Sequence, residues 1–518
     1  MRLERSKNTI RNILFGTGSK LLTILMPFAV RTVFIYTLGA EYLGLNSLFT
    51  SILTILNLTE LGFSNAIVFS MYRPIAEEDT DSINALLSFY RTVYRWVGLI
   101  ILAVGLALIP LLPRLVKGGA PEDISLTAVY LVYLFNTAAS YFLYGYMSAL
   151  LTAYQRDDLI SRVNIAVTFF KYALQIVVLL SVRDYYIYII IMPVFTLLNN
   201  LVTALVARRV FPQHRPFGRI SREQKAEVNE KVRGMFVNKV CWASRNAFDS
   251  IFISAFLGLT DTAIYNNYYF IMNSVVALMQ VLYMSALSGI GNSIVTESVE
   301  KNYSDMRRMN FVYLWVAAWC TSCLLCLYQP FMLLWAGASM LFPMGVVVLM
   351  CVYFYSLMLG DIKSIYSHAA GLWWENRYRA IGEALANLLL NYFLGKRFGV
   401  YGIVAATIIS LLTIDYYFGT RIVFRCYFKG QSMGKFFREN FVYLIVTVIV
   451  AGSCYFVCML LPDDGIGAFI VKVLVCMAVP NGLMLAAYCK TAIFRESVPW
   501  LLNKFSFSRR LLRAKENG

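Results

Sequence analysis

The sequence predicts an all-α integral membrane protein with about fourteen transmembrane helices. Hydrophobic residues make up 59% of the 518 residues and charged residues only 14%, against about 25% charged in a soluble protein. The stretch from Met309 to Gly360 contains no Asp, Glu, Lys or Arg. Such a run suffices for two crossings of about 20 residues each and a turn. The basic residues gather between the apolar runs, as in multi-pass membrane proteins.

Each predicted span is an apolar run bounded by charged or helix-breaking residues. A helix is the expected form because it pairs its backbone polar groups internally, and hydrocarbon offers them no other partner. In chain order, the spans are predicted at 10–38, 42–72, 83–113, 124–151, 160–181, 185–207, 234–258, 263–295, 309–335, 341–367, 379–395, 400–424, 441–461 and 466–489.

The connecting segments differ sharply in charge between the two faces of the membrane. Segments on one face hold 31 of the 46 Lys and Arg residues, and those on the other face hold five. The positive-inside rule then places both termini in the cytoplasm and requires an even number of spans. The same rule explains the net charge of +17, so we predict no nucleic-acid partner.

A hydrophilic segment near the middle of the chain, from Arg208 to Arg233, predicts a linker between two halves. It alternates basic residues with glutamates, which is typical of a solvated connecting segment. We predict an N-terminal lobe of six helices (1–207), a basic cytoplasmic linker (208–233), a C-terminal lobe of six helices (234–427), and two additional helices with a basic cytoplasmic tail (428–518).

An internal repeat supports this division. Shifting the first half by 219 positions places Lys20 on Lys239 and Trp96 on Trp315. With an insertion, the segment GFSNAI that begins at Gly62 aligns with GIGNSI, which begins at Gly289. The first span of each half runs outward from the cytoplasm, so the halves are expected to be pseudo-symmetric about an axis along the membrane normal, with the substrate path between them.

Cysteines and histidines indicate neither a metal centre nor an enzyme. All ten cysteines lie within or at the ends of apolar spans, which argues against an extracellular disulfide framework. Cys320, Cys323 and Cys326 imitate an iron–sulfur spacing, but cysteines in an uncharged helix are more often small packing residues. Only two histidines are present. We therefore predict no metal, no cofactor and no catalytic residues.

Charged residues inside the spans are the candidates for function, because each costs about 2.5 to 3.5 kcal/mol to insert. Ten basic residues lie in spans against five acids, so the interior has the sign that receives a phosphate or an acidic sugar. The strongest candidates come from the opening spans of the two halves, with one more at a possible cytoplasmic mouth. The predicted substrate-cavity residues are Lys20, Arg31, Lys239, Arg245 and Arg91.

Several of these residues have two interpretations. Arg245 and Asp249 lie one helical turn apart and either serve the substrate or neutralise each other. Glu60 either binds a coupling ion or pairs with Arg31. Asn266, Asn267 and Tyr268 in the run YNNYYFI are candidate sugar contacts, although tyrosines near a helix end also serve as interface anchors.

Two segments resemble the polysaccharide flippase family of the multidrug/oligosaccharidyl-lipid/polysaccharide exporter superfamily. They are YLGLNSLFTSILTILNLTELGFSNAIVFSMYRPIAEED (Tyr42 to Asp79) and FLGLTDTAIYNNYYFI (Phe256 to Ile271). The resemblance implies two six-helix lobes in a V shape, two additional C-terminal helices and a cationic central cavity. It also implies alternating access, with cavity residues from the first two helices of each lobe. A membrane potential, or a proton or sodium gradient, is the implied energy source.

On this resemblance we expect a bacterial plasma-membrane flippase for a polyprenyl-diphosphate-linked oligosaccharide of O-antigen or capsule type. It would move the repeat unit from the cytoplasmic to the outer leaflet. Other membrane proteins of polysaccharide assembly are candidate partners. Two alternatives stay open: a cation-coupled multidrug antiporter of the same fold, which needs an acidic cavity, and a membrane polymerase or glycosyltransferase, which usually needs a large catalytic loop.

Overall fold

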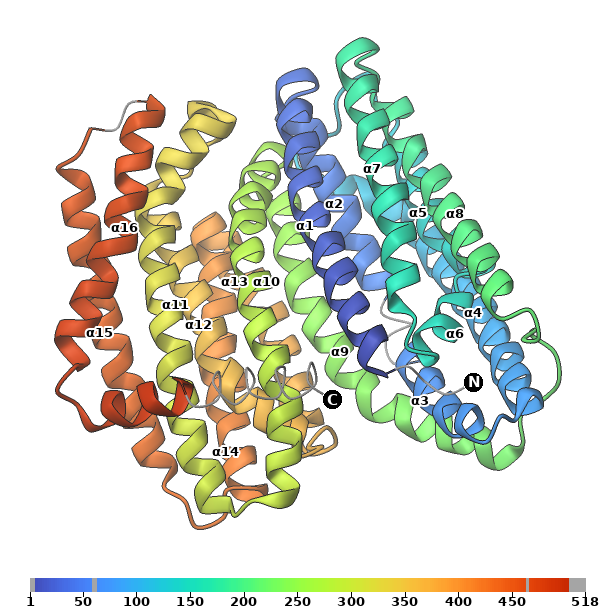
Figure 1. Ribbon diagram of the computed structural model, residues 1–518. Coiled ribbons are helices and arrows are strands. Elements are labelled where there is room, and N and C mark those ends of the chain that lie inside the picture. The colour runs from blue at the N-terminus through green and yellow to red at the C-terminus, as the bar shows by residue number, and fades with distance from the viewer. Residues whose placement is uncertain (1–4, 58–62, 463–464, 503–518) are drawn as a thin grey trace. The chain divides into compact units, whose positions relative to one another are not determined.

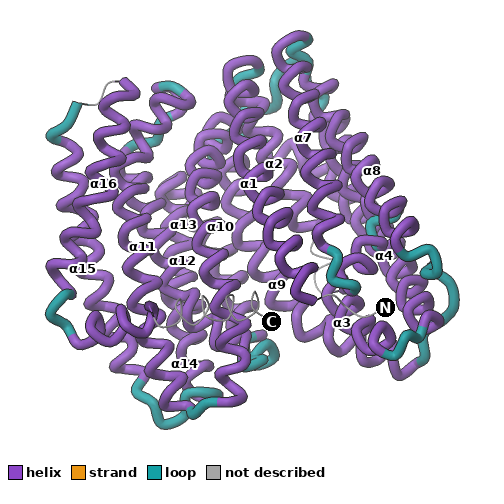
Figure 2. Tube along the Cα trace, in the orientation of Figure 1, coloured by secondary structure: helices purple, strands orange, loops and turns teal. Residues whose placement is uncertain are grey.

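The computed structural model describes residues 5–57, 63–462 and 465–502. Within these ranges the chain consists of helices joined by short connections, without β-strands (Figure 2). Contacts divide the chain into two compact units, Met1–Asn266 and Asn267–Gly518, and the division falls inside one long helix. This division does not test the predicted lobes, 1–207 and 234–427, which stay a prediction.

The first unit contains nine complete α-helices and the start of a tenth within the part of the chain that is described (Figure 1). Helix α1 packs on α7, α7 on α8, and α5 on both α4 and α8, while α9 packs on α2 and α3. The helices are α1 (Arg5–Thr37), α2 (Ala40–Leu56), α3 (Phe63–Ala76), α4 (Thr80–Leu108), the 3₁₀ segment η2 (Ile109–Leu115), α5 (Leu126–Phe142), α6 (Met147–Ala153), α7 (Asp157–Ser181), α8 (Tyr185–Val210), α9 (Arg222–Phe256) and α10 (Leu259–Thr296).

The second unit contains the rest of α10 and the helices that follow it. Helix α11 is central, because α12, α15 and α16 all pack against it. The helices are α11 (Val299–Ala336), the 3₁₀ turn η3 (Ala338–Met340), α12 (Met344–Ala369), α13 (Arg377–Ser410), the π-helix η4 (Leu411–Tyr416), α14 (Tyr417–Cys426), α15 (Met433–Met459) and α16 (Gly465–Tyr488).

Among the described residues, nine helical segments are long and apolar enough to cross a membrane. The pair α5 and α6, bent by 55°, makes a tenth if it is one crossing, and three shorter apolar helices lie at 22–37, 40–56 and 247–256. The set is consistent with the predicted number of about fourteen. The chain is therefore a multi-pass, all-α membrane protein, as the sequence predicts.

Side-chain caps explain where many helices begin. The side chains of Asp79, Ser125 and Asp184 accept hydrogen bonds from backbone N–H groups in the first turns of α4, α5 and α8. Ser221 and Gln224 form a reciprocal capping box at the start of α9. Each cap satisfies a backbone donor that the helix itself leaves open. Because α9 begins at Arg222, the second half of the predicted linker is already helical.

One predicted span is broken in the structure, and another contains residues outside the described part of the chain. The span predicted at 42–72 is described as α2 and α3, with residues 58–62 outside the described part of the chain. The span predicted at 124–151 is broken between α5 and α6, where Tyr144 has a φ of 59°. This left-handed conformation is costly for a residue with a Cβ atom and cannot continue an α-helix.

The segment Arg377–Cys426 forms an antiparallel hairpin and not one long helix. Gly399 has a φ of 59° and a ψ of −136°, outside the helical region. The hydrogen-bonded pairs show that the two legs run in opposite directions. Arg379 contacts Asp415 and Asn387 contacts Thr407, so the residue number rises along one leg while that of its partner falls along the other. The two legs match the spans predicted at 379–395 and 400–424.

Close backbone contact between the two legs generates a prediction. A Cβ atom at Gly402 would overlap the carbonyl group of Leu394 in the other leg. We expect Gly402→Val to destabilise the protein by about 1–3 kcal/mol through overpacking, measured as a lower midpoint of thermal unfolding in detergent. The control is Gly452→Val in α15, where a Cβ atom would meet nothing within 4 Å. Equal midpoints for the two variants would contradict the close contact.

The connection between α8 and α9 packs against the helices of the first unit, and its His214 side chain is only 3% exposed. A hydrogen bond of 2.7 Å joins its Nε2 to the Tyr154 hydroxyl, and the N–H of Arg215 donates to the Asn84 side chain at 2.8 Å. Burial lowers the pKa of His214 below its ordinary value of 6.5, because removal from water disfavours the charged ring.

The lowered pKa of His214 generates a pH prediction. The unfolded chain takes up this proton at a higher pH than the folded chain, so the contribution of His214 to stability is complete above about pH 6.5 and declines as the pH falls. We expect wild type to exceed His214→Gln in thermal stability at pH 8, and the difference to shrink toward pH 5. A difference that stays constant with pH would contradict this role of His214.

Candidate functional site

Arg31, a predicted cavity residue, lies in α1 within a group of aromatic residues. Phe34, one turn further along α1, packs edge-to-face on Tyr188 of α8 with ring centroids 5.0 Å apart. Arg31 interacts electrostatically with Tyr188. On the neighbouring helix α7, the ammonium of Lys171 lies 4.1 Å from the ring centroid of Tyr172. Helices α1, α7 and α8 thus carry two cations together with π-faces and hydroxyl groups.

Arg91 is half-buried in α4. It lies close to the buried Tyr146 between α5 and α6, and Arg208 at the end of α8 is also close to that tyrosine. The guanidinium of Arg208 lies 5.0 Å from the ring centroid of Tyr144. The bend between α5 and α6 is therefore flanked by two arginines, and an anionic group would find two guanidinium groups there.

Arg245 and Asp249, one turn apart on α9, are both buried, with exposed fractions of 6% and 1%. Asp249 accepts a hydrogen bond of 3.0 Å from the Tyr265 hydroxyl of α10. The amide of Asn266 donates to Ser250 at 3.1 Å, next to this pair. The structure thus joins Asp249 to the YNNYYFI segment, a link that sequence spacing could not show because the two elements lie on different helices.

The three candidate sugar contacts differ in their surroundings. Asn266 is half-buried, whereas Asn267 and Tyr268 are fully buried. The Tyr268 hydroxyl donates to Gln329 at 2.9 Å and accepts from the N–H of Phe342 at 3.3 Å. Its ring also stacks on Phe342. In this conformation Tyr268 is a packing residue of the second unit, and Asn266 contacts Ser250, the residue that follows Asp249.

The structure does not describe the side chains of three of the predicted site residues. Glu60 lies in the undescribed segment 58–62, and the side chains of Lys20 in α1 and Lys239 in α9 are not described. Their assigned roles stay predictions.

Positive charge is in excess among the spans of the first unit. Where side chains are described, only Asp249 is acidic within the predicted spans of this unit. The basic residues within the same spans are Arg31, Arg91, Arg95, Arg162, Lys171 and Arg245, and Arg162 pairs with Asp158 just before its span. An anion that enters this unit would therefore meet a positive potential.

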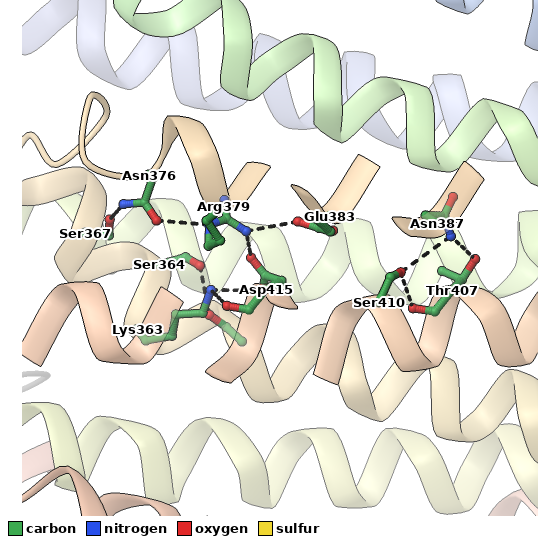
Figure 3. A network of polar contacts seen from close by, with 11 residues as sticks. Lys363, Ser364, Ser367, Asn376, Arg379, Glu383, Asn387, Thr407, Ser410 and Asp415 are labelled. Carbon is green, nitrogen blue, oxygen red and sulfur yellow. Dashed lines mark hydrogen bonds and ion pairs between the residues drawn. The ribbon is translucent and has the colours of Figure 1, made fainter. Parts of the chain in front are cut away.

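The second unit, in contrast, holds a nearly balanced network of ion pairs (Figure 3). Asp415 in η4 pairs with Lys363 of α12 at 2.9 Å and also with Arg379 of α13. Arg379 additionally pairs with Glu383 at 2.9 Å. Two cations and two carboxylates thus neutralise one another across three elements, and Lys363 is only 3% exposed.

The network extends along the hairpin through neutral groups. Asn376 accepts from Arg379 at 3.0 Å and donates to Ser367 at 2.9 Å. Further along, the amide of Asn387 donates to Thr407 at 3.0 Å. Lys363, Glu383 and Asp415 lie within predicted spans and Arg379 lies at a span boundary, but the sequence gives no sign that these residues are partners.

Asp415 owes its position to the π-helix η4. In a π-helix the backbone hydrogen bonds join residues i and i+5. Such turns are rare overall, but those that occur are often found at functional sites. Here the wider turn lies opposite α12 and α13, where the carboxylate meets both cations. Buried polar groups need such partners, because a charge without one costs several kcal/mol.

The arrangement of helices is similar to that of several solved membrane transporters. Similar solved structures include the lipid II flippase MurJ in an inward-closed conformation, with 15% identity and a TM-score of 0.67, covering 92% of this chain and 99% of that chain. An inward-facing multidrug resistance MATE family transporter of the MOP superfamily has 14% identity and a TM-score of 0.59, covering 77% and 94%. These similarities show the fold and confirm the predicted fold class.

A MOP superfamily transporter from Pyrococcus furiosus, described as having a binding pocket of reverse polarity, shares 13% identity with a TM-score of 0.55, covering 81% of this chain and 96% of that one. Residues 9–290 match the family model described as polysaccharide biosynthesis protein. The chain belongs to this family, which confirms the resemblance seen in the sequence. No curated protein sequence matches the chain.

The ion-pair network generates a stability prediction. Asp415→Asn leaves Lys363 and Arg379 buried without this carboxylate, and removal of one partner from a buried pair typically costs about 3–5 kcal/mol. We expect a large fall in the thermal unfolding midpoint of the purified protein.

The matched control is Glu77→Gln, whose pair with Arg73 has side chains 55% and 86% exposed. Such surface pairs contribute about 0–1 kcal/mol. If Asp415→Asn lowered the midpoint no more than Glu77→Gln, the network would not hold the hairpin to α12.

Proposed function

We propose that this protein is a flippase for an anionic, polyprenyl-diphosphate-linked oligosaccharide of O-antigen or capsule type. It moves the unit from the cytoplasmic to the outer leaflet of a bacterial plasma membrane, with both termini in the cytoplasm. The observation that carries the proposal is the excess of basic residues within the spans of the first unit, in a chain that belongs to the polysaccharide biosynthesis family.

The diphosphate is the group that these cations would receive. Guanidinium groups bind phosphate through paired, charge-assisted hydrogen bonds, which are stronger than neutral ones. Arg31 and Arg245 are the principal candidates. The lipid tail stays in the bilayer while the head group crosses, so the protein needs a polar path for the head group alone.

An inside-negative membrane potential has the right sign to drive this movement. Each elementary charge that crosses 100 mV is worth about 2.3 kcal/mol, so a diphosphate with two negative charges would gain about 4.6 kcal/mol when it moves outward. A proton or sodium gradient is the alternative source. A cationic drug would be repelled by the same basic residues, which argues against the multidrug antiporter.

Reconstitution into liposomes tests the proposal directly. The substrate is a labelled polyprenyl-diphosphate oligosaccharide, and its appearance on the opposite leaflet is scored with an imposed potential, with an ion gradient alone, and with neither. Protein-dependent translocation is the expected outcome. Elongated product would indicate a polymerase, and efflux of an organic cation without movement of the labelled lipid would indicate an antiporter.

Two substitutions test the cationic path in the same assay. A charge-assisted hydrogen bond contributes about 1.5–3 kcal/mol, so Arg31→Ala and Arg245→Ala should each slow translocation roughly ten- to hundredfold. Arg31→Lys should retain part of the rate, because it keeps the charge without the paired donors.

Arg73→Ala is the control, since Arg73 is exposed and paired with Glu77, and its translocation rate should equal that of wild type. All variants are first checked for folding by thermal unfolding. Full rates in both alanine variants would exclude the cationic path while leaving the family and the fold unaffected.

A further inference from the structure

Four buried cysteines converge in the second unit. Cys326 comes from α11, Cys454 and Cys458 from α15, and Cys476 from α16. Their exposed fractions are 4%, 0%, 3% and 0%. All four sulfur atoms lie within 4.8 Å of one another. We call this group the tetracysteine cluster.

The sulfur spacing of the cluster matches that of a tetrahedral thiolate site. The Sγ of Cys454 lies 3.7 Å from that of Cys326 and 4.0 Å from that of Cys476. The Sγ atoms of Cys458 and Cys476 are also 4.0 Å apart. In a tetrahedron with Zn–S bonds of about 2.3 Å, neighbouring sulfurs are about 3.8 Å apart. A disulfide requires about 2.05 Å, well below these separations.

The backbone around the cluster is fixed by further contacts. The indole N–H of Trp319 donates to the carbonyl of Cys476 at 2.9 Å, and Cys323 on the same helix lies 3.8 Å from that carbonyl. Leu327, Tyr455, Val475 and Val479 pack around the four cysteines. Outer groups of this kind orient metal ligands and exclude water from a site.

The buried residue Lys472 lies on the same face of α16 as Cys476 of the cluster. Lys472 is 3% exposed and precedes Cys476 by one helical turn, so both side chains lie on one face of the helix. Four thiolates around a divalent ion carry a net charge of −2, which is costly in a low-dielectric interior. The positive charge of Lys472 would offset part of it.

We propose that the tetracysteine cluster binds a single thiolate-preferring divalent metal ion, Zn²⁺, as a structural site. Binding converts the four thiols to thiolates and releases four protons to water, with no change in oxidation state. The site is closed, since all four tetrahedral positions are filled by cysteine. It would tie α15 and α16 to α11, independently of what the protein transports.

Metal analysis of the full-length protein, purified in detergent without chelators, tests the proposal. We expect about one zinc per chain by mass spectrometry of the elements. Cys454→Ser and Cys476→Ser keep the side-chain size and should lose the zinc. Cys351→Ser is the matched control, because Cys351 is buried in α12 outside the cluster, and it should keep the zinc.

A second measurement covers the case in which the serine variants fail to fold. Titration of the wild-type protein with a thiol-specific mercurial should release zinc to a colorimetric chelator, completely once the cluster thiols have reacted. Wild type should also melt at a lower temperature in the presence of a strong chelator, and Cys351→Ser should show the same shift.

Three outcomes would overturn the proposal. Ten free thiols in the denatured protein with no bound metal would make the cluster a packing contact. Fewer free thiols, restored by reduction, would indicate a disulfide. Zinc that persists in both serine variants would place the metal elsewhere. None of these outcomes bears on flippase activity, which the liposome assay measures separately.

Discussion

A polar group inside a bilayer must find its partner within the protein, and the structure depends on this constraint throughout. It dictates helices, because a helix pairs its own backbone groups. It also governs side chains: Asn310 meets Asn440 at 2.6 Å, and the Tyr328 hydroxyl donates to the backbone carbonyl of Tyr268 at 3.1 Å. These contacts hold helices together where apolar burial gives little preference for one neighbour over another, since lipid is equally apolar.

The helices could be predicted from short stretches of sequence. The contacts between residues far apart in the chain could not. Apolar runs placed the predicted spans on helices, although α9 begins 12 residues and α11 10 residues before the predicted span. Capping residues such as Ser221 and Asp184 mark several helix starts. Gly399 fell between two predicted spans, where the hairpin turns. Lys363 and Asp415 are 52 positions apart and Cys326 and Cys454 are 128 apart. Only the packing of helices brings such residues together, and one sequence carries no record of it.

The two units use buried charge in different ways. In the second unit, Arg379 is shared between Asp415 and Glu383, so each cation has a carboxylate beside it. Within the described spans of the first unit, Asp249 is the single acid beside six basic residues. A balanced network favours one fixed arrangement of helices, whereas an excess of one sign attracts an ion of the other sign. Under the proposed function, stability and substrate attraction would therefore rest on different parts of the chain.

The π-helix η4 has a consequence for the register of its helix. Successive residues of an α-helix are rotated by about 100°, so returning η4 to α-helical geometry would turn Asp415 away from Lys363 and Arg379. The six residues Leu411–Tyr416 therefore keep their poorer backbone geometry only while the carboxylate is held from both sides. A rotation of the hairpin leg after Gly399 about its own axis would therefore break the ion pairs of Asp415 with Lys363 and with Arg379 at the same time.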